Sequence, residues 1–150
     1  MRAVVQRVSR AEVSVGGEVV GRCGPGLLVL LAAHRHSVEP QSLDLADRVA
    51  GLRIFSDSTG KMNLALKDLP DSGEPQVLVV SQFTLYADAY SSRRPSFTES
   101  AGYDQGKALY ESFVRAIKPL VRGVQTGEFG AHMEVSLVND GPVTLVIDAR

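Results

Sequence analysis

The longest apolar run of the chain, residues 27–33, restricts the possible folds more than any other feature of the sequence. Its seven residues, Leu-Leu-Val-Leu-Leu-Ala-Ala, are too few to cross a bilayer, which takes about 20, but they fit a strand that is buried on both faces. The chain has 150 residues, of which 44% are hydrophobic and 22% charged, as in ordinary globular domains. We therefore expect a single domain over residues 1–150, soluble and without a membrane segment.

Shorter valine-rich segments surround this run and alternate apolar with polar residues, the pattern of half-buried strands. Gly16-Gly17 is expected to close a hairpin between two of them. The segment 76–84, with Val-Leu-Val-Val at its start, is the clearest strand signal. Near the end, the turn residues 139–142 predict a closing hairpin or a tight strand connection. The predicted strands cover residues 3–8, 11–15, 19–20, 27–33, 53–55, 76–84, 133–137 and 143–147.

Helical spacing of apolar residues occurs in two segments. It predicts one helix between residues 40 and 53, with Ser37 as its cap, and another over 102–121. Residues 87–100 are polar and without period, which indicates a long loop of the kind that is often functional. This order of elements favours an α+β fold in which an antiparallel or mixed sheet forms an open, barrel-like layer with two main helices packed on it.

The net charge and the cysteine content limit the classes of function that this chain can have. The net charge of −1 means that any nucleic acid would be met by a local basic patch or a small contact area. Arg93-Arg94 could bind phosphate or could be solvated loop residues. Cys23 is the only cysteine, which excludes an intramolecular disulfide and predicts a buried thiol. His34 and His36 lack a third ligand nearby, so we expect no metal and no cofactor. The N-terminus lacks a secretory signal pattern, which suggests a cytoplasmic protein.

The first segment that could carry chemistry is Ser81-Gln82-Phe83-Thr84, at the end of the predicted strand 76–84. In a strand, Gln82 and Thr84 project to the same side. Main-chain amides that leave the sheet at a strand end can also donate hydrogen bonds to a developing oxyanion. The simpler alternative is that these polar residues only meet solvent.

The second candidate segment is the run Asn-Asp-Gly-Pro-Val-Thr, residues 139–144. It is typical of a tight turn, and its Gly-Pro bond can be cis at a cost of about 0.5–1 kcal/mol. A cis bond would aim the Gly141 carbonyl in a fixed direction, where it could accept a hydrogen bond from a ligand ammonium. A plain hairpin turn is the alternative. The chain contains no phosphate-binding loop, dinucleotide fingerprint or serine-hydrolase elbow.

Together these two segments resemble the signature motifs of the D-aminoacyl-tRNA deacylases, Ser-Gln-x-Thr and Asn-x-Gly-Pro-x-Thr. Further segments resemble the family in the same order, so the resemblance covers nearly the whole chain. They are residues 1–8, 26–31, 53–57, 60–64, 94–97 and 125–127. The residues after the buried strand, 32–36, depart from the family pattern.

The resemblance implies hydrolysis of the ester that joins a D-amino acid, or mischarged glycine, to the terminal adenosine of tRNA. It implies a homodimer in which a cis Gly-Pro turn enters the partner's site and excludes L-amino acids. Amides around the first motif would stabilise the oxyanion. Thr84 could act as a nucleophile or could orient the substrate, and we favour orientation because the motif contains no histidine or lysine to activate the hydroxyl. The catalytic residues implied are Ser81, Gln82, Phe83 and Thr84, the chiral selectors are Gly141 and Pro142, and the supporting residues are Arg7, Asn139 and Thr144.

Two other functions compete with this interpretation. One is a non-catalytic nucleic-acid-binding module on the same fold, because fold does not determine function. The other is an editing deacylase for mischarged L-amino acids. Both motifs are intact, which argues against the first, and the intact Gly-Pro pair argues against the second.

Overall fold

One long strand, β1 (Arg2–Val15), organises the sheet. Along one edge it pairs antiparallel with β8 (Glu134–Asp148). Along the other edge it pairs with β3 (Gly26–Ala32) through its first half and with β2 (Glu18–Cys23) through its second half. The structure is a computed structural model that describes residues 1–149. Gly16 and Gly17 both have positive φ and form the expected hairpin between β1 and β2.

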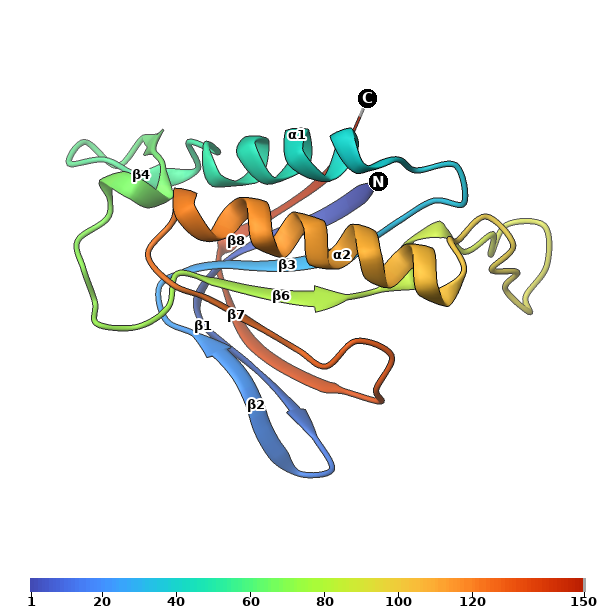
Figure 1. Ribbon diagram of the computed structural model, residues 1–150. Helices are drawn as coiled ribbons and strands as arrows, with labels where there is room; N and C mark the ends of the chain where they lie inside the picture. The colour runs from blue at the N-terminus through green and yellow to red at the C-terminus, as the bar shows by residue number, and fades with distance from the viewer. Residues whose placement is uncertain (150) are drawn as a thin grey trace.

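Two parallel strands complete the six-stranded sheet. β6 (Val77–Ser81) pairs with β3, and β7 (Val124–Thr126) pairs with β6. Since β2 also lies against β7, the sheet curls toward a barrel (Figure 1). The predicted mixed, open-barrel sheet is thereby confirmed. A separate two-stranded sheet joins β4 (Phe55–Ser56) to β5 (Met62–Leu64).

The helices α1 (Glu39–Ala50) and α2 (Tyr103–Ile117) lie side by side over one face of the sheet (Figure 1). Their apolar stripes form the main core with the sheet residues that point toward them. The fully buried side chains of this core include Val5, Leu27, Val29, Leu45, Val49, Leu66, Val77, Val79, Phe113 and Ile117. No helix among residues 1–149 is both long enough and apolar enough to span a membrane.

A second, smaller core lies on the opposite face, inside the curl of the sheet. It is made of Val8, Ala11, Val13, Cys23, Leu28, Leu78 and Val80. The central strands β3 and β6 are therefore buried on both sides, as the run at residues 27–33 predicts. Cys23 is 4% exposed, which confirms the expected buried thiol.

Three short 3-10 helices connect the larger elements. They are η1 (Leu66–Asp68), η2 (Phe83–Tyr86) and η3 (Lys118–Leu120). The helix predicted for 102–121 thus ends at Ile117 and continues as η3. The cap of α1 is Val38 rather than Ser37, because the Ser37 hydroxyl instead accepts a hydrogen bond from the His34 amide. Residues 87–100 form the expected loop, closed by a bridge between Asp88 and Ser96.

Several strand predictions need correction. The two strands expected within residues 3–15 are one, because register shifts at residues 6–10 bend β1 without breaking it. The hairpin expected at 139–142 is instead part of the continuous strand β8, whose pairing partner throughout is β1. The strand expected at 76–84 ends at Ser81, and that at 53–55 lies at Phe55–Ser56. β5 and β7, of three residues each, were too short to show a period.

Candidate active site

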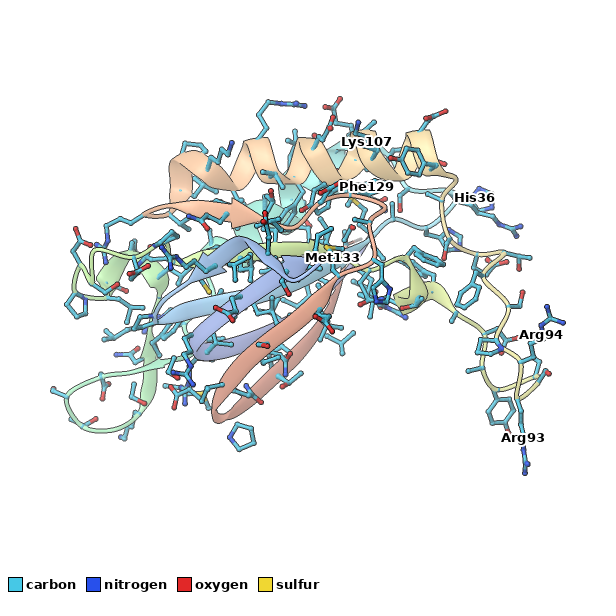
Figure 2. All side chains as sticks on the ribbon, turned by 90° about the horizontal axis from the view of Figure 1, so that it is seen from below. His36, Arg93, Arg94, Lys107, Phe129 and Met133 are labelled. Carbon is cyan, nitrogen blue, oxygen red and sulfur yellow. The ribbon has the colours of Figure 1, made fainter. Side chains whose placement is uncertain are left out.

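A cavity of about 490 Å³ opens where β3 and β6 end. Its wall includes Ser81, Gln82 and Phe83 from the first predicted motif. The end of β3, the first half of α2 and the connection between β7 and β8 form most of the rest, and Figure 2 places Phe129 and Met133 on that connection. Most of the lining is apolar or aromatic, with few polar groups, which is typical of a small-molecule site. Of the histidines in the chain, His132 lines this cavity, whereas His34 and His36 do not.

The backbone leaves the sheet sharply at the end of β6. The Gln82 amide still donates to the Leu31 carbonyl at 2.8 Å, as the last hydrogen bond to β3. The next residues begin η2, and the first N–H groups of any helix lack acceptors within it. Within the described residues, the amides of Phe83 and Thr84 donate no hydrogen bond. They are therefore available to a ligand beside the cavity.

Gln82 and Thr84 hydrogen-bond one another, whereas the sequence predicted only that both side chains project to the same side of a strand. The Gln82 Nε2 donates to Thr84 Oγ1 at 2.5 Å. The prediction assumed an extended strand through residue 84, but Thr84 lies in η2, whose turn brings the two side chains together. In the described part of the chain, no histidine, lysine or carboxylate hydrogen-bonds the Thr84 hydroxyl. Nothing among residues 1–149 is placed to activate this hydroxyl as a nucleophile.

The second motif has the cis Gly141-Pro142 bond that the sequence suggested. Both residues are exposed, and Gly141 has a φ of +123°, which an L side chain rarely adopts. A Cβ at Gly141 would also lie 2.8 Å from Arg7 Nη2. The turn therefore requires glycine for both its backbone conformation and its close approach to Arg7.

Buried Arg7 connects the turn to the body of the protein. Its Nε donates to the Asp140 carbonyl at 3.1 Å and lies 3.1 Å from the Asp140 carboxylate, and its Nη1 donates to the Ile54 carbonyl at 2.5 Å. Asn139 Nδ2 donates to the Arg7 and Val143 carbonyls at 2.9 and 3.0 Å. The three residues predicted to support the turn thus lie together around it, since Thr144 Oγ1 is 3.4 Å from Asn139 Oδ1.

The two motifs do not meet within one chain. Ser81 aligns across the sheet with Leu31, Ala3 and finally Ile147 on β8, which is about 14 Å over three strand spacings. The Gly-Pro turn lies further along β8, where that strand pairs with residues 6–8 of β1, about 13 Å away along the strands. The cavity lining accordingly contains neither Gly141 nor Pro142.

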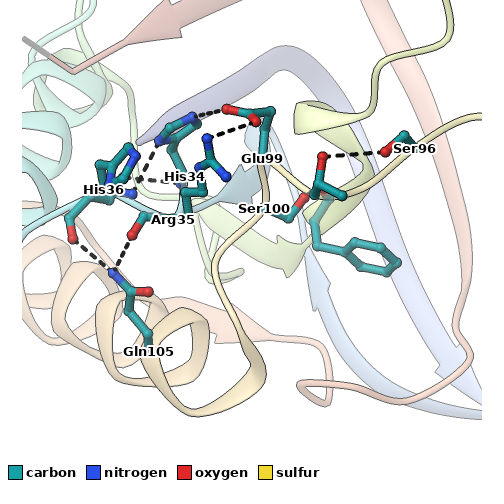
Figure 3. A network of polar contacts seen from close by, with 10 residues as sticks. His34, Arg35, His36, Ser96, Glu99, Ser100 and Gln105 are labelled. Carbon is teal, nitrogen blue, oxygen red and sulfur yellow. Dashed lines mark hydrogen bonds and ion pairs between the residues drawn. The ribbon is translucent and has the colours of Figure 1, made fainter.

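A polar network beside the site includes residues that the sequence analysis missed (Figure 3). Glu99 accepts from His34 Nε2 at 3.0 Å and pairs with Arg35 at 3.2 Å. The neighbouring Ser100 donates its hydroxyl to the Phe83 carbonyl at 2.8 Å. This network anchors loop 87–100 to the ends of β3 and β6. In the sequence, only the length of loop 87–100 pointed to a functional role for these residues.

Two other titratable groups have pKa values that burial raises. Burial raises the pKa of the hydroxyl of Tyr110, a cavity-lining residue that donates to the Val79 carbonyl at 2.9 Å. Desolvation also raises the pKa of Cys23 to about 11. Among residues 1–149, no three histidine, cysteine, aspartate or glutamate side chains come together as metal ligands would.

A sequence profile of the family described as D-Tyr-tRNA(Tyr) deacylase matches residues 4–148 of this chain. The chain belongs to this family. The D-aminoacyl-tRNA deacylase of Thermosipho africanus is 54% identical over 150 residues, which cover 100% of this chain and 98% of the relative. That of Thermotoga petrophila is 55% identical over 149 residues, or 99% and 97% of the two chains. The resemblance inferred from the two motifs is therefore confirmed.

Solved structures agree with the deacylase fold. One described as c-Myc DNA Unwinding Element Binding Protein superposes with a TM-score of 0.90 at 34% identity, and covers 100% of this chain and 99% of its own. Another, described as a probable eukaryotic D-amino acid tRNA deacylase, superposes with a TM-score of 0.82 over 97% of each chain. Its identity of 18% supports the fold alone.

Proposed function

We propose that this deacylase-family chain hydrolyses the ester between a D-amino acid, or mischarged glycine, and the terminal adenosine of tRNA. The observation that carries the proposal is the cavity at the end of β6, where Ser81, Gln82 and Phe83 meet free main-chain amides. Curated relatives at about 50% identity and named D-aminoacyl-tRNA deacylase support the same reaction. The released tRNA becomes available for correct charging.

The chemistry assigned to this site is attack by water with stabilisation of an oxyanion. The amides of Phe83 and Thr84 are the donors, and loss of one such donor typically costs about 10²–10³ in rate. The Ser81 hydroxyl and the Gln82 side chain orient the terminal adenosine. Thr84, held by Gln82, positions substrate without attacking it, and the ribose hydroxyl of the tRNA assists the water.

Chiral selection is assigned to the Gly141-Pro142 turn of a second copy of the chain in a homodimer. A partner is needed because the turn and the cavity lie far apart in one chain. The turn is exposed, and Arg7 and Asn139 hold it in place, as insertion into a partner's cavity requires. The outer edge of β8 pairs with no strand among residues 1–149.

Selectivity then follows from the geometry at the substrate Cα. If the Gly141 and Pro142 carbonyls accept the substrate ammonium, exchanging hydrogen and side chain drives an L side chain into the turn. The L substrate is rejected by this clash, while a D side chain points into open space. Glycine has no side chain to reject, so the site accepts it.

The deciding experiment compares release of D-tyrosine from D-tyrosyl-tRNA with release of L-tyrosine from L-tyrosyl-tRNA, at catalytic enzyme concentration. We expect rapid turnover of the D substrate only, also in the presence of a chelator, because no step is assigned to a metal. Gly141→Ala and Pro142→Ala should both weaken turnover and selectivity, and thermal unfolding will show whether each variant folds. No turnover of any aminoacyl-tRNA by the wild-type protein would contradict the proposal.

We further assign the whole chain, residues 1–150, to one cytoplasmic domain that binds the acceptor end of aminoacyl-tRNA. The near-neutral charge agrees with this small contact area, since the formal net charge is −1. A protein that bound the whole tRNA tightly would compete with translation for every charged tRNA. Limited proteolysis tests the domain assignment, because one domain should yield no stable fragment.

A further inference from the structure

The loop 87–100 carries a charged and aromatic tip that the catalytic cycle leaves without a role. Tyr90 is fully exposed, at 102% of its reference area. Arg93 and Arg94 are exposed, and Figure 2 shows them at the far end of the loop, which projects from the body of the protein. In the described residues, no carboxylate lies within ion-pair distance of either arginine. The loop therefore exposes two unpaired guanidinium groups and an aromatic ring to solvent.

The base of this loop is built to hold the tip in one place. Backbone hydrogen bonds of 2.8 and 2.9 Å join Asp88 and Ser96 in both directions. The Asp88 carboxylate accepts from the amides of Tyr90 and Ser91 at 2.9 and 3.1 Å and from the Ser91 hydroxyl at 2.5 Å. The Asp88 carboxylate, the acidic group near the tip, is therefore hydrogen-bonded within the loop and does not pair with Arg93 or Arg94.

The same loop is fastened to the catalytic motif. The Phe97 ring packs edge-on against the Phe83 ring, with centroids 5.2 Å apart. Ser100 donates to the Phe83 carbonyl at 2.8 Å. Arg94 precedes Phe97 by three residues, a chain length of about 10 Å at most. The backbone of Arg94 therefore lies within about 10 Å of Phe97, whose ring packs on the cavity-lining Phe83.

We propose that residues 88–96 form an arm that binds the single-stranded 3′ end of the tRNA through its phosphates. This inference rests on the proposed function. Arg93 and Arg94 pair with phosphates of the nucleotides that precede the terminal adenosine, because guanidinium groups bind phosphate through paired N–H donors. Tyr90 offers a flat ring on which an unpaired base can stack. The arm supplies a local basic contact in a chain whose net charge is −1.

The test uses two substrates with the same ester. One is D-tyrosyl-tRNA, and the other is adenosine that carries D-tyrosine on its 3′ hydroxyl and has no phosphate. For the double variant Arg93→Ala/Arg94→Ala, we expect kcat/KM on the tRNA substrate to fall about tenfold, mainly through KM. The slope of log(kcat/KM) against log(salt) should shrink by about 1.4, or 0.7 for each lost phosphate contact. Turnover of the adenosine ester should stay unchanged.

The matched control is Arg48→Ala/Lys67→Ala, which removes the same charge from exposed positions on α1 and η1. It should leave both substrates and the salt slope unchanged. Equal losses on both substrates, or none on either, in the arm variant would overturn the inference while the proposed function stands. If the wild-type protein hydrolyses neither ester, the proposed function fails and this inference falls with it.

Discussion

The Thr84 hydroxyl accepts its hydrogen bond from an amide, and this decides the role we assign to it. Gln82 Nε2 donates at 2.5 Å, and no base lies beside the hydroxyl in the described residues. A threonine without a base is a weak nucleophile, whereas a held hydroxyl can orient substrate. The residue is therefore treated as positioning, in keeping with water attack.

Replacing Thr84 tests this role directly. Thr84→Val should lower kcat about fivefold to tenfold, the value of one ordinary hydrogen bond, and Thr84→Ser should restore it. Single-turnover kinetics with mass spectrometry of the quenched enzyme would measure both the rate and any acyl-enzyme. A covalent acyl-threonine adduct, or a loss of about 10⁴, would show that Thr84 is the nucleophile.

The buried Cys23 thiol should make the stability of the fold depend on pH in the alkaline range. Desolvation raises its pKa from the ordinary 9.0 to about 11 in the folded protein. Between these values the unfolded thiol ionises first, so stability that is complete below pH 9 is lost as pH rises toward 11. We expect the free energy of unfolding to fall by about 2 kcal/mol more in the wild type than in Cys23→Ala, measured by urea denaturation.

Labelling provides a second measurement of the same residue. At pH 8 a thiol reagent should leave native Cys23 unmodified, because the group is both neutral and buried, and should modify it at once in urea. Rapid labelling of the folded protein would contradict the second core as described.

At the scale of elements, contact between β2 and β7 brings two strands of the curled sheet together. Gly21 makes this close contact possible, since a Cβ there would lie 2.4 Å from the Thr126 carbonyl oxygen. Next to it, the Arg22 amide donates to Gln125 Oε1 at 2.8 Å. Strands that approach so closely cannot accept even one methyl group without moving apart.

Gly21→Ala should therefore destabilise the protein by about 1–3 kcal/mol, the usual cost of overpacking. Gly102→Ala is the control, because a Cβ at Gly102 meets no atom within 4 Å. Urea denaturation of the two variants, followed by circular dichroism, compares them. Equal stabilities would mean that β2 and β7 separate at little cost.

The boundaries of the helices and strands show which elements the spacing of apolar residues could predict and which it could not. The two helices and the buried strands followed from spacing of apolar residues, because a stripe or a continuous run depends only on local sequence. The spacing of apolar residues did not predict that residues 134–148 form one strand, because Asn-Asp-Gly-Pro has the composition of a turn. Pairing with β1 on both sides of Gly141-Pro142 overrides that local preference.

For the whole molecule, the exposed face beside β8 bears on the proposed homodimer. Val146 is 65% exposed and lies opposite Val4 in the register of β8 and β1, while its neighbours Leu145 and Ile147 pack against the helix-side core. By strand alternation Val146 faces away from the helices. An apolar side chain exposed there is suited to contact with a second copy.

Val146→Lys should shift the protein toward monomer and lower deacylation at least tenfold, because the Gly-Pro turn then lacks a partner's cavity. Leu43→Lys, at a 51% exposed position on α1, should change neither property. Analytical ultracentrifugation measures the mass, and D-tyrosyl-tRNA turnover measures the activity. A wild-type protein that is monomeric and active at the assay concentration would contradict the dimer.

The sequence by itself determined the α+β class, both motifs and the cis-capable Gly-Pro bond, because each depends on residues close together in the chain. Only the tertiary structure decided that the first motif leaves its strand at Ser81. It also decided that Glu99 and Ser100 hold the site and that the two motifs lie apart. These features join residues tens of positions apart, and the strand register that brings such residues together follows from packing of the whole sheet rather than from local preference.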